Sequence, residues 1–221
     1  MSKPITLYSH KGGPNPWKVA IILEELGLPY ETTFIEFQDM KKEGRFIDIN
    51  PNGRVPAIED PNTGVAMFES GAIIEYLVET YDKPNNLTYT SSPEKYLLKS
   101  WLHFQMSGQG PYFGQKAWFE LYHPEKNLKS AIDRYANEIR RVLGVVDAHL
   151  KKQGTEYLVG DKCTYADLAW VPWDMALQFL LGEGAKKLEE ELPTYKAWHD
   201  RLMARPAVQK IVEDRTKANS Q

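Results

Sequence analysis

The chain has 221 residues, with 27 Lys and Arg against 30 Asp and Glu, and a formal net charge of −3. This length allows one or two domains with a sizeable core, and the charge gives no reason to expect nucleic acid or an anionic membrane as a partner. The single cysteine, Cys163, excludes an internal disulfide and a metal site built from several cysteines. No apolar run reaches the length of a membrane span and the first ten residues lack a signal-peptide core, so we expect a cytoplasmic protein.

The first 80 residues alternate short extended segments with helical ones, a pattern typical of a βαβ domain. Apolar residues at helical spacing, followed by Gly27, predict a helix over Trp17–Leu26. The other predicted elements are the strands Ile5–Ser9, Thr32–Phe37, Arg54–Ile58 and Val65–Phe68 and the helix Ser70–Tyr81. The polar stretch Gln38–Asn50 carries no clear pattern, so the expected order is β-α-β-(α)-β-β-α.

The second half shows helical periodicity almost throughout. The polar, proline-containing segment Asp82–Pro93 lacks a helical pattern and is interpreted as a linker. Beyond it, apolar spacing predicts helices over Pro93–Gln109, Leu128–Lys151, Thr164–Leu181, Thr194–Arg205 and from Ala207 onward. The sequence therefore predicts an α/β domain followed by an all-helical one.

Thr164 and Asp167 form an S/T-x-x-D pattern directly before an apolar run. The threonine hydroxyl can accept from a backbone N–H while the aspartate reaches back to the helix start, so we interpret the pair as a capping box. Cys163 precedes this cap, with no second cysteine or histidine near it in sequence, and is interpreted as a packing residue rather than a catalytic thiol.

A strand, a glycine- and proline-rich turn and then a helix span Ser9 to Trp17, an arrangement that directs backbone N–H groups at a bound anion or thiolate. The turn holds no cysteine pair, so a reactive sulfur there must come from a bound cofactor. The amide of Asn15 is the best candidate to stabilise that thiolate. Lowering a thiol pKa by two units requires about 2.7 kcal/mol, and a charge-assisted hydrogen bond supplies about 1.5–3 kcal/mol.

Two alternatives stay open at this turn. Asn15 also suits a simple helix cap. The hydroxyl of Ser9 is a rival donor, whereas Tyr8 points to the other side of the strand if side chains alternate.

Two further elements suit a peptide-like ligand. In a cis Val55-Pro56 bond, the amide and carbonyl of Val55 would be exposed for pairing with a peptide. Ser70 begins a helix, so it is either an N-cap or, with the helix N-terminus, a site for a ligand carboxylate, while Glu69 would meet an ammonium group.

These pieces together resemble the glutathione transferase superfamily over essentially the whole chain. The segments INPNGRVPAIED and FESGAIIEYLVETY resemble its glutathione-binding signature, and CTYADLAWVPW resembles its helical-domain capping box. Within the superfamily, LYSHKGGPNPWKVAIILEELGLPYE is similar to the fungal branch related to the prion-forming nitrogen-catabolite regulator, and to the bacterial Nu class.

The resemblance implies a thioredoxin-like domain over residues 1–83, a helical domain over 92–221, and a homodimer that binds glutathione and no metal. It places Asn15 near the glutathione sulfur and the Val55 backbone, before Pro56, against the cysteinyl part. Glu69 and Ser70 would hold the γ-glutamyl end. Arg54, with Lys41 or Lys42, would bind the glycine carboxylate.

Two expectations concern the helical half. The resemblance implies that Arg134 reaches the ligand across the dimer interface, and the alternative is a solvated helix face. Trp118, Phe119 and Tyr122 are apolar candidates for the acceptor wall, and the alternative is plain core or dimer contacts.

The function implied is glutathione-dependent transfer, with reduction of disulfides or peroxides favoured over conjugation to electrophilic carbon. A small electrophile, disulfide or peroxide is thus the expected second substrate. The alternative is a non-catalytic binding or regulatory module of the same fold, because a fold does not guarantee an activity.

Overall fold

The computed structural model describes residues 2–42 and 44–220. Packing divides the chain into two compact units, the first containing the residues up to Thr88 and those from Ala204 onward, and the second containing Tyr89–Met203. The last helix thus belongs with the N-terminal unit, although it follows the helical half in sequence. The bounds 1–83 and 92–221 follow chain order instead, and stay a prediction.

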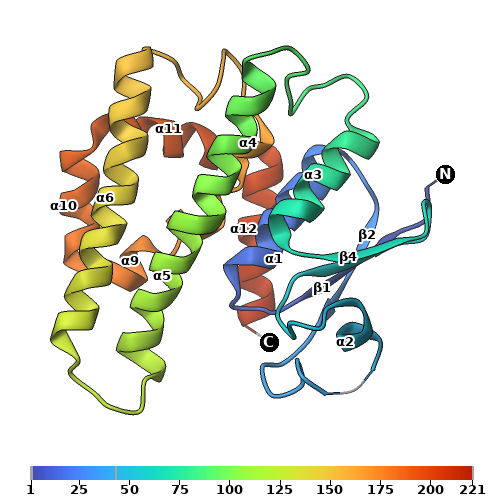
Figure 1. Cartoon of the computed structure of the whole chain (residues 1–221), viewed down its shortest axis with the longest axis horizontal. Helices are drawn as coiled ribbons and strands as arrows, with labels where there is room; N and C mark the ends of the chain where they lie inside the picture. The colour runs from blue at the N-terminus through green and yellow to red at the C-terminus, as the bar shows by residue number, and fades with distance from the viewer. Residues whose placement is uncertain (1, 43, 221) are drawn as a thin grey trace. The chain divides into compact units, whose positions relative to one another are not determined.

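The first unit is built on one mixed sheet (Figure 1). Within the described residues its strands follow the order β2-β1-β3-β4, with β1 parallel to β2 and β3 antiparallel to both β1 and β4. The strands are β1 (Ile5–Ser9), β2 (Tyr30–Phe34), β3 (Ala57–Asp60) and β4 (Val65–Phe68). This small mixed sheet with its helices is the predicted thioredoxin-like fold.

Helices cover both faces of the sheet. α1 and α3 pack on the face that carries Ile5 and Leu7, and α2 lies on the opposite face, where its Phe46 meets Tyr8 (Figure 1). These helices are α1 (Pro14–Glu25), α2 (Arg45–Ile49) and α3 (Ser70–Tyr81). The predicted order is confirmed, and α2 occupies the polar stretch that showed no pattern, in which Glu43 lies outside the described residues.

Several element bounds differ from the prediction for local reasons. α1 begins at Pro14 rather than Trp17, because Gly13 takes the N-cap position and proline suits a first helical turn. β3 begins only at Ala57, because Pro56 has no N–H to give to a strand ladder.

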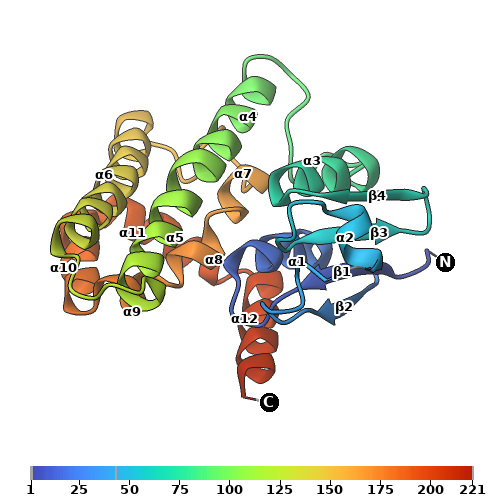
Figure 2. The same cartoon turned by 60° about the horizontal axis from the view of Figure 1, so that its bottom comes forward.

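The C-terminal helix α12 (Pro206–Asn219) lies along α1 in both views (Figures 1 and 2). The guanidinium of Arg205 donates two hydrogen bonds to the carboxylate of Glu25, at 2.6 and 2.7 Å. Lys210 Nζ donates to Glu24 Oε1 at 2.6 Å. Buried Val208 and Ile211 complete the contact, so α12 covers the outer side of α1.

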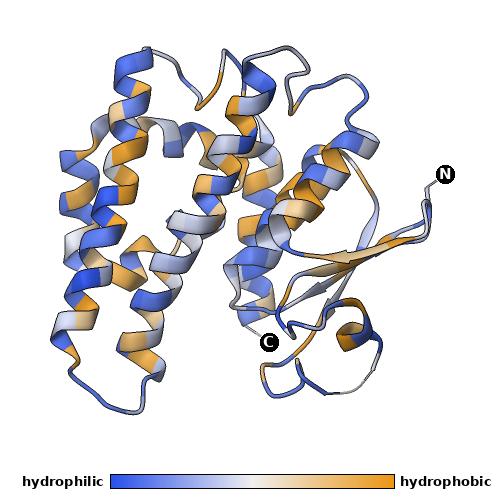
Figure 3. Cartoon of the chain, viewed as in Figure 1, coloured by the Kyte–Doolittle hydropathy of each residue, from blue (hydrophilic) through white to orange (hydrophobic). Residues whose placement is uncertain are grey.

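The second unit is helical throughout its regular structure. Its elements are α4 (Glu94–Phe104), π-helical η1 (Gln105–Gln109), α5 (Gly110–Ala117), π-helical η2 (Trp118–Tyr122), α6 (Lys129–Gln153), α7 (Tyr165–Leu168), α8 (Val171–Asp174), α9 (Leu177–Leu181), α10 (Glu183–Glu191) and α11 (Pro193–Met203). Figure 3 shows polar and apolar residues alternating along α6, as an amphipathic helix requires. The long helix predicted from Leu128 is therefore confirmed.

The single helix predicted over Thr164–Leu181 is wrong. The segment breaks into α7, α8 and α9. Pro172 lacks the N–H that would bond to the carbonyl of Leu168, so a continuous helix cannot pass this position unbroken.

The capping box at the start of α7 is confirmed. Asp167 Oδ2 accepts from the backbone N–H of Thr164 at 2.9 Å and from its hydroxyl at 2.8 Å. Asp167 Oδ1 accepts from the N–H of Leu158 at 2.8 Å and from Trp198 Nε1 at 2.9 Å. The box therefore also ties α11 to the loop before α7. The segment Asp82–Pro93 contains neither helix nor strand, as predicted for a linker.

Candidate functional site

The strand register brings the predicted site segments to one edge of the sheet. Tyr8 pairs with Ala57, and Ala57 pairs with Phe68, so these three residues form one row across β1, β3 and β4. Directly beyond that row the chain continues into the turn after β1, leads back through the segment before β3, and enters α3 after β4. Segments from three separate stretches of sequence thus meet at this edge.

Asn15 lies in the first turn of α1 and is half-buried. The N-cap residue is Gly13, so the alternative that Asn15 caps this helix is wrong. The preceding turn is held by Gly13 N–H to the carbonyl of His10 at 3.2 Å and by Trp17 Nε1 to the carbonyl of Lys11 at 3.0 Å. This places the Asn15 amide at the positive end of a helix of 12 residues, where negative charge is stabilised.

The neighbouring hydroxyls are less suited to assist a sulfur. Ser9 is 1% exposed, and its Oγ has no hydrogen-bond partner within the described part of the chain. Tyr8 points to the opposite face, as strand alternation predicts, and its hydroxyl donates to Glu59 Oε1 at 2.6 Å. Burial, reinforced by Glu59, raises the pKa of Tyr8 to about 12, so this phenol holds its proton at neutral pH.

The Val55-Pro56 peptide is cis, the form considered from the sequence. The loop before it is organised by Asn50, a buried residue that the sequence analysis did not single out. Its side-chain amide donates to the carbonyl of Arg54, and its Oδ1 accepts from the N–H of Asn52 at 3.1 Å. A polar residue in an otherwise irregular stretch gave no periodic signal by which to find it.

The basic side chains near this loop are exposed, as a carboxylate site requires. Arg54 and Lys41 both reach solvent. Gly53, at φ +62°, has no room for a side chain, because a Cβ would lie 3.0 Å from Lys41 Cγ and 3.0 Å from the carbonyl of Met40. This close packing sets Lys41 beside the loop of Arg54, whereas Lys42 forms an ion pair with Asp39.

Glu69 is the N-cap of α3 and Ser70 is its first residue, so Ser70 is not the N-cap considered from the sequence. Glu69 is exposed and adopts φ +72°, a left-handed conformation that is costly for a residue with a side chain. Ser70 is buried, and its Oγ accepts from Lys18 Nζ at 3.3 Å. The N-terminal parts of α1 and α3 are therefore in direct contact.

Lys18 is the second residue that the sequence analysis missed. It is 1% exposed, and burial lowers its pKa to about 7, while the charge of Glu69 opposes that shift. The sequence did hold a signal for Lys18, which is a charged residue beside the apolar run of α1. Lysine is almost never fully buried unless it has a partner, so a lysine on this helix could have pointed to a buried contact.

The helical unit holds the remaining predicted residues. Arg134 is exposed on α6, with its guanidinium 6.0 Å from the ring centroid of Tyr135. Trp118 and Tyr122 are exposed and stacked on each other, and Phe119 is half-buried, stacking on Tyr135 at 5.6 Å. The alternative of plain core packing is therefore wrong for Trp118 and Tyr122.

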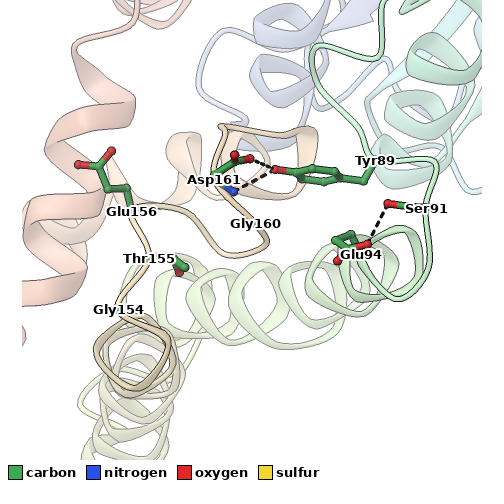
Figure 4. A pocket seen from close by; sticks show the side chains of 8 residues that line it. All are labelled: Tyr89, Ser91, Glu94, Gly154, Thr155, Glu156, Gly160 and Asp161. Atoms are coloured by element: carbon green, nitrogen blue, oxygen red, sulfur yellow. Dashed lines mark hydrogen bonds between the residues drawn. The ribbon is translucent and has the colours of Figure 1, made fainter.

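A pocket of about 570 Å³ lies in the helical unit, and no predicted site residue lines it. Figure 4 shows two bonded pairs among its polar side chains: the Tyr89 hydroxyl donates to Asp161 Oδ1, and the Ser91 hydroxyl donates to Glu94 Oε2. The two bonds measure 2.6 and 2.9 Å. A Cβ at Gly160 would lie 2.3 Å from the Tyr89 hydroxyl. We interpret this pocket as a surface hollow beside a structural contact.

Cys163 is buried, and its thiol lies 3.9 Å from the carbonyl oxygen of Thr164. Among the described residues, no group of three or more His, Cys, Asp and Glu side chains is arranged to hold a metal ion. Within the same part of the chain, no helix is long and apolar enough to cross a membrane.

Comparison with known proteins connects this geometry to a family. Residues 3–79 match the family described as "Glutathione S-transferase, N-terminal domain", and residues 114–215 match "Glutathione S-transferase, C-terminal domain". The chain is 52% identical over 209 residues to the glutathione S-transferase-like protein OpS6 of Beauveria bassiana, covering 95% of this chain and 94% of that protein.

Two solved structures from Phanerochaete chrysosporium are also similar. The glutathione transferase URE2P6, in complex with oxidized glutathione, is 50% identical with a TM-score of 0.91, covering 98% of both chains. Ure2p5, cocrystallized with 1-(S-glutathionyl)-2,4-dinitrobenzene, is 38% identical with a TM-score of 0.89, covering 100% of this chain and 98% of that one. The chain thus belongs to the glutathione S-transferase family, in its fungal Ure2-like branch.

Proposed function

We propose that this chain is a glutathione-dependent enzyme that reduces disulfide bonds, with peroxides as further acceptors, and that Asn15 stabilises the glutathione thiolate. The observation that carries the proposal is the meeting of three segments at one sheet edge. The turn of Asn15, the Val55-Pro56 peptide and the Glu69-Ser70 helix start supply donors for a thiolate, a peptide backbone and a γ-glutamyl group.

The proposed contacts follow the chemistry of each part. The Asn15 amide and the N-terminus of α1 face the sulfur, and the backbone of Val55 pairs with the cysteinyl residue. Ser70 and the N-terminus of α3 take the γ-glutamyl carboxylate, while Glu69 takes the ammonium group. Arg54 and Lys41 bind the glycine carboxylate, because both are exposed beside the same loop.

The nearby protein groups favour Asn15 over its rivals. Tyr8 is turned away and holds its proton, and the Ser9 hydroxyl is buried. Cys163 lies in the helical unit, buried beside a carbonyl. A neutral amide donor at a helix N-terminus can supply the roughly 2.7 kcal/mol that a two-unit lowering of a thiol pKa requires.

The reaction needs no enzyme thiol. The bound thiolate attacks one sulfur of the disulfide, forming a mixed glutathione disulfide and releasing the other sulfur as a thiolate. A second glutathione thiolate then attacks the mixed disulfide, releasing the remaining thiol and leaving oxidized glutathione. The oxidized glutathione held by the URE2P6 relative is the product of such a sequence. Reduced glutathione is consumed, so we place the enzyme in the cytoplasm.

We further propose a homodimer in which Arg134 reaches the ligand of the partner subunit. The exposed aromatic residues Trp118 and Tyr122, with Phe119 beside them, are proposed as part of the acceptor wall. Their exposure leaves them available either to an acceptor or to another copy of the chain.

Conjugation to electrophilic carbon is the second candidate activity. The dinitrobenzene conjugate cocrystallized with the Ure2p5 relative favours it, and it would use the same thiolate. The alternative to an enzyme is a non-catalytic module of the same fold that binds glutathione.

The test is glutathione-dependent reduction of hydroxyethyl disulfide, coupled to glutathione reductase. Asn15→Ala should lower turnover about 10- to 100-fold, the equivalent of one lost charge-assisted hydrogen bond of 1.5–3 kcal/mol. Asn86→Ala, an exposed asparagine of the linker, is the matched control and should keep wild-type turnover.

Equal turnover of Asn15→Ala and wild type would contradict the proposal that Asn15 stabilises the glutathione thiolate. Glutathione binding without turnover of disulfide or peroxide by wild type would overturn the reductase proposal. Conjugation of 1-chloro-2,4-dinitrobenzene, measured next, would then separate a transferase from a binding module.

A further inference from the structure

Lys18 is a charged residue inside the apolar core, in contact with the candidate site. It is 1% exposed, lies three residues after Asn15 on α1, and donates from Nζ to Ser70 Oγ at 3.3 Å. Residues three apart share one helix face, so Lys18 lies beneath the same side of α1 as Asn15. None of the contacts proposed above for glutathione uses this amine.

Many titratable groups lie on the elements packed around Lys18, but one of them, Glu69, shifts its pKa. Its own helix ends with Glu24 and Glu25, which pair with α12, and the turn before α1 carries His10 and Lys11. The remaining titratable groups on the packed elements are Tyr8 on β1, Glu75, Tyr76, Glu79 and Tyr81 on α3, and Arg205, Lys210, Glu213, Asp214, Arg215 and Lys217 on and beside α12. The charge that acts on the pKa of Lys18 is that of Glu69, at the N-cap of α3.

A carboxylate bound at the start of α3 would change this balance. It would accept from Ser70 Oγ at about 2.7 Å, so its charge would lie within about 6 Å of Lys18 Nζ. An opposite charge at 4–6 Å favours the charged form of a lysine, and more so where water is excluded. The ligand's ammonium group opposes this effect from the exposed Glu69, whereas the carboxylate bonds to Ser70, the direct partner of Lys18. Binding would therefore stabilise the protonated amine.

We propose that Lys18 is a positioning residue that orients Ser70 for the γ-glutamyl carboxylate and takes up a proton when that carboxylate binds. The inference rests on the proposed glutathione site and concerns how that site recognises an anion. Without ligand, the amine loses its proton near pH 7, whereas with ligand it keeps its proton to higher pH. Affinity should therefore fall as pH rises from 7 to 8.5, by up to tenfold per unit.

The experiment is isothermal titration of the full chain with S-methylglutathione, which has no thiol proton to lose. Titration at pH 8 in buffers of different ionisation enthalpy counts the protons taken up. At Lys18, wild type should take up about 0.8 proton, the change for an amine whose pKa rises from about 7 by roughly two units or more on binding. The ligand's own amine can add a further share of about 0.5 proton at this pH, and Lys18→Met retains that share, so the difference between the two proteins counts the Lys18 proton.

Lys18→Met keeps the length of the side chain and removes the charge. It should take up about 0.8 proton fewer than wild type, weaken binding about tenfold at pH 7, and show a smaller fall of affinity between pH 7 and 8.5. Its melting temperature should not fall, because at pH 7 the unfolded chain binds this proton more tightly than the folded one. Lys83→Met, an exposed lysine just after α3, is the matched control and should behave as wild type.

The outcomes separate the two proposals. Tight binding by Lys18→Met with undiminished proton uptake would overturn the role of Lys18 and leave the glutathione site standing. No binding by folded wild type would overturn the site itself. If Lys18→Met does not fold, wild-type uptake decides: a value of about 0.8 or more supports the inference, and a smaller value overturns it.

Discussion

Two helices of this chain begin with a hydroxyl residue near a carboxylate, and their polar groups are satisfied differently. At α7, Asp167 is buried and accepts from Thr164, Leu158 and Trp198, all within the helical unit. At α3, Glu69 is exposed at a positive φ, and the buried Ser70 bonds to a lysine of another helix.

This contrast separates a structural helix start from the one that we propose binds a ligand. The α7 box is closed, because each carboxylate oxygen of Asp167 already has donors from the protein. The α3 start has no side-chain cap, keeps its carboxylate in solvent, and accepts a conformational cost at Glu69. Strained residues cluster at binding sites, so these features agree with the proposed ligand contact at Glu69.

The largest effect is expected at the capping box of α7. Asp167→Ala should lower the free energy of unfolding by about 3 kcal/mol or more, because it leaves buried donors of Thr164, Leu158 and Trp198 without their acceptor. Urea unfolding followed by tryptophan fluorescence measures it. Asp133→Ala, which removes an exposed ion pair with Lys129, should cost well under 1 kcal/mol. Equal losses for the two variants would contradict the structural role of the box.

At the start of α3, one substitution should raise the free energy of unfolding and weaken ligand binding. Glu69→Gly should raise the free energy of unfolding by about 1 kcal/mol, because glycine adopts φ +72° without steric cost. The same change should weaken S-methylglutathione binding about tenfold, the equivalent of losing a charge-assisted contact worth about 1.5 kcal/mol. Denaturation and titration calorimetry measure the two effects.

Glu69→Gln separates charge from backbone conformation. It keeps the side chain at positive φ, so we expect weaker binding without added stability. Should Glu69→Gly bind as tightly as wild type, the ammonium contact assigned to Glu69 would be wrong.

The smallest effect is expected at Cys163, next to the capping box of α7. Cys163→Ala should leave disulfide reduction within about twofold of wild type and lower the free energy of unfolding by about 1 kcal/mol, since it removes one buried sulfur. The coupled assay described for Asn15 measures turnover. Loss of activity in this variant would point to an enzyme thiol and against a glutathione-only mechanism.

Local sequence determined much of the molecule. The capping box at Thr164, the amphipathic helix from Leu128 and the βαβ order of the first half follow from residue spacing, which acts over a few residues. The lack of any cysteine in the turn after β1 already predicted that a reactive sulfur there would come from a ligand. Bounds next to prolines were less predictable, as at Pro14 and Pro172, because one missing N–H shifts or breaks a helix.

Which distant residues meet follows from the tertiary structure alone. Lys18 and Ser70 are 52 positions apart, and the row Tyr8–Ala57–Phe68 exists only through strand pairing. α12 is placed with the N-terminal unit by the burial of Val208 and Ile211, and Arg205 and Lys210 form ion pairs with α1, all contacts that no local pattern encodes. The physical reason is that periodicity reports which face of an element is buried, whereas the partner of that face is chosen by packing and charge across the whole fold.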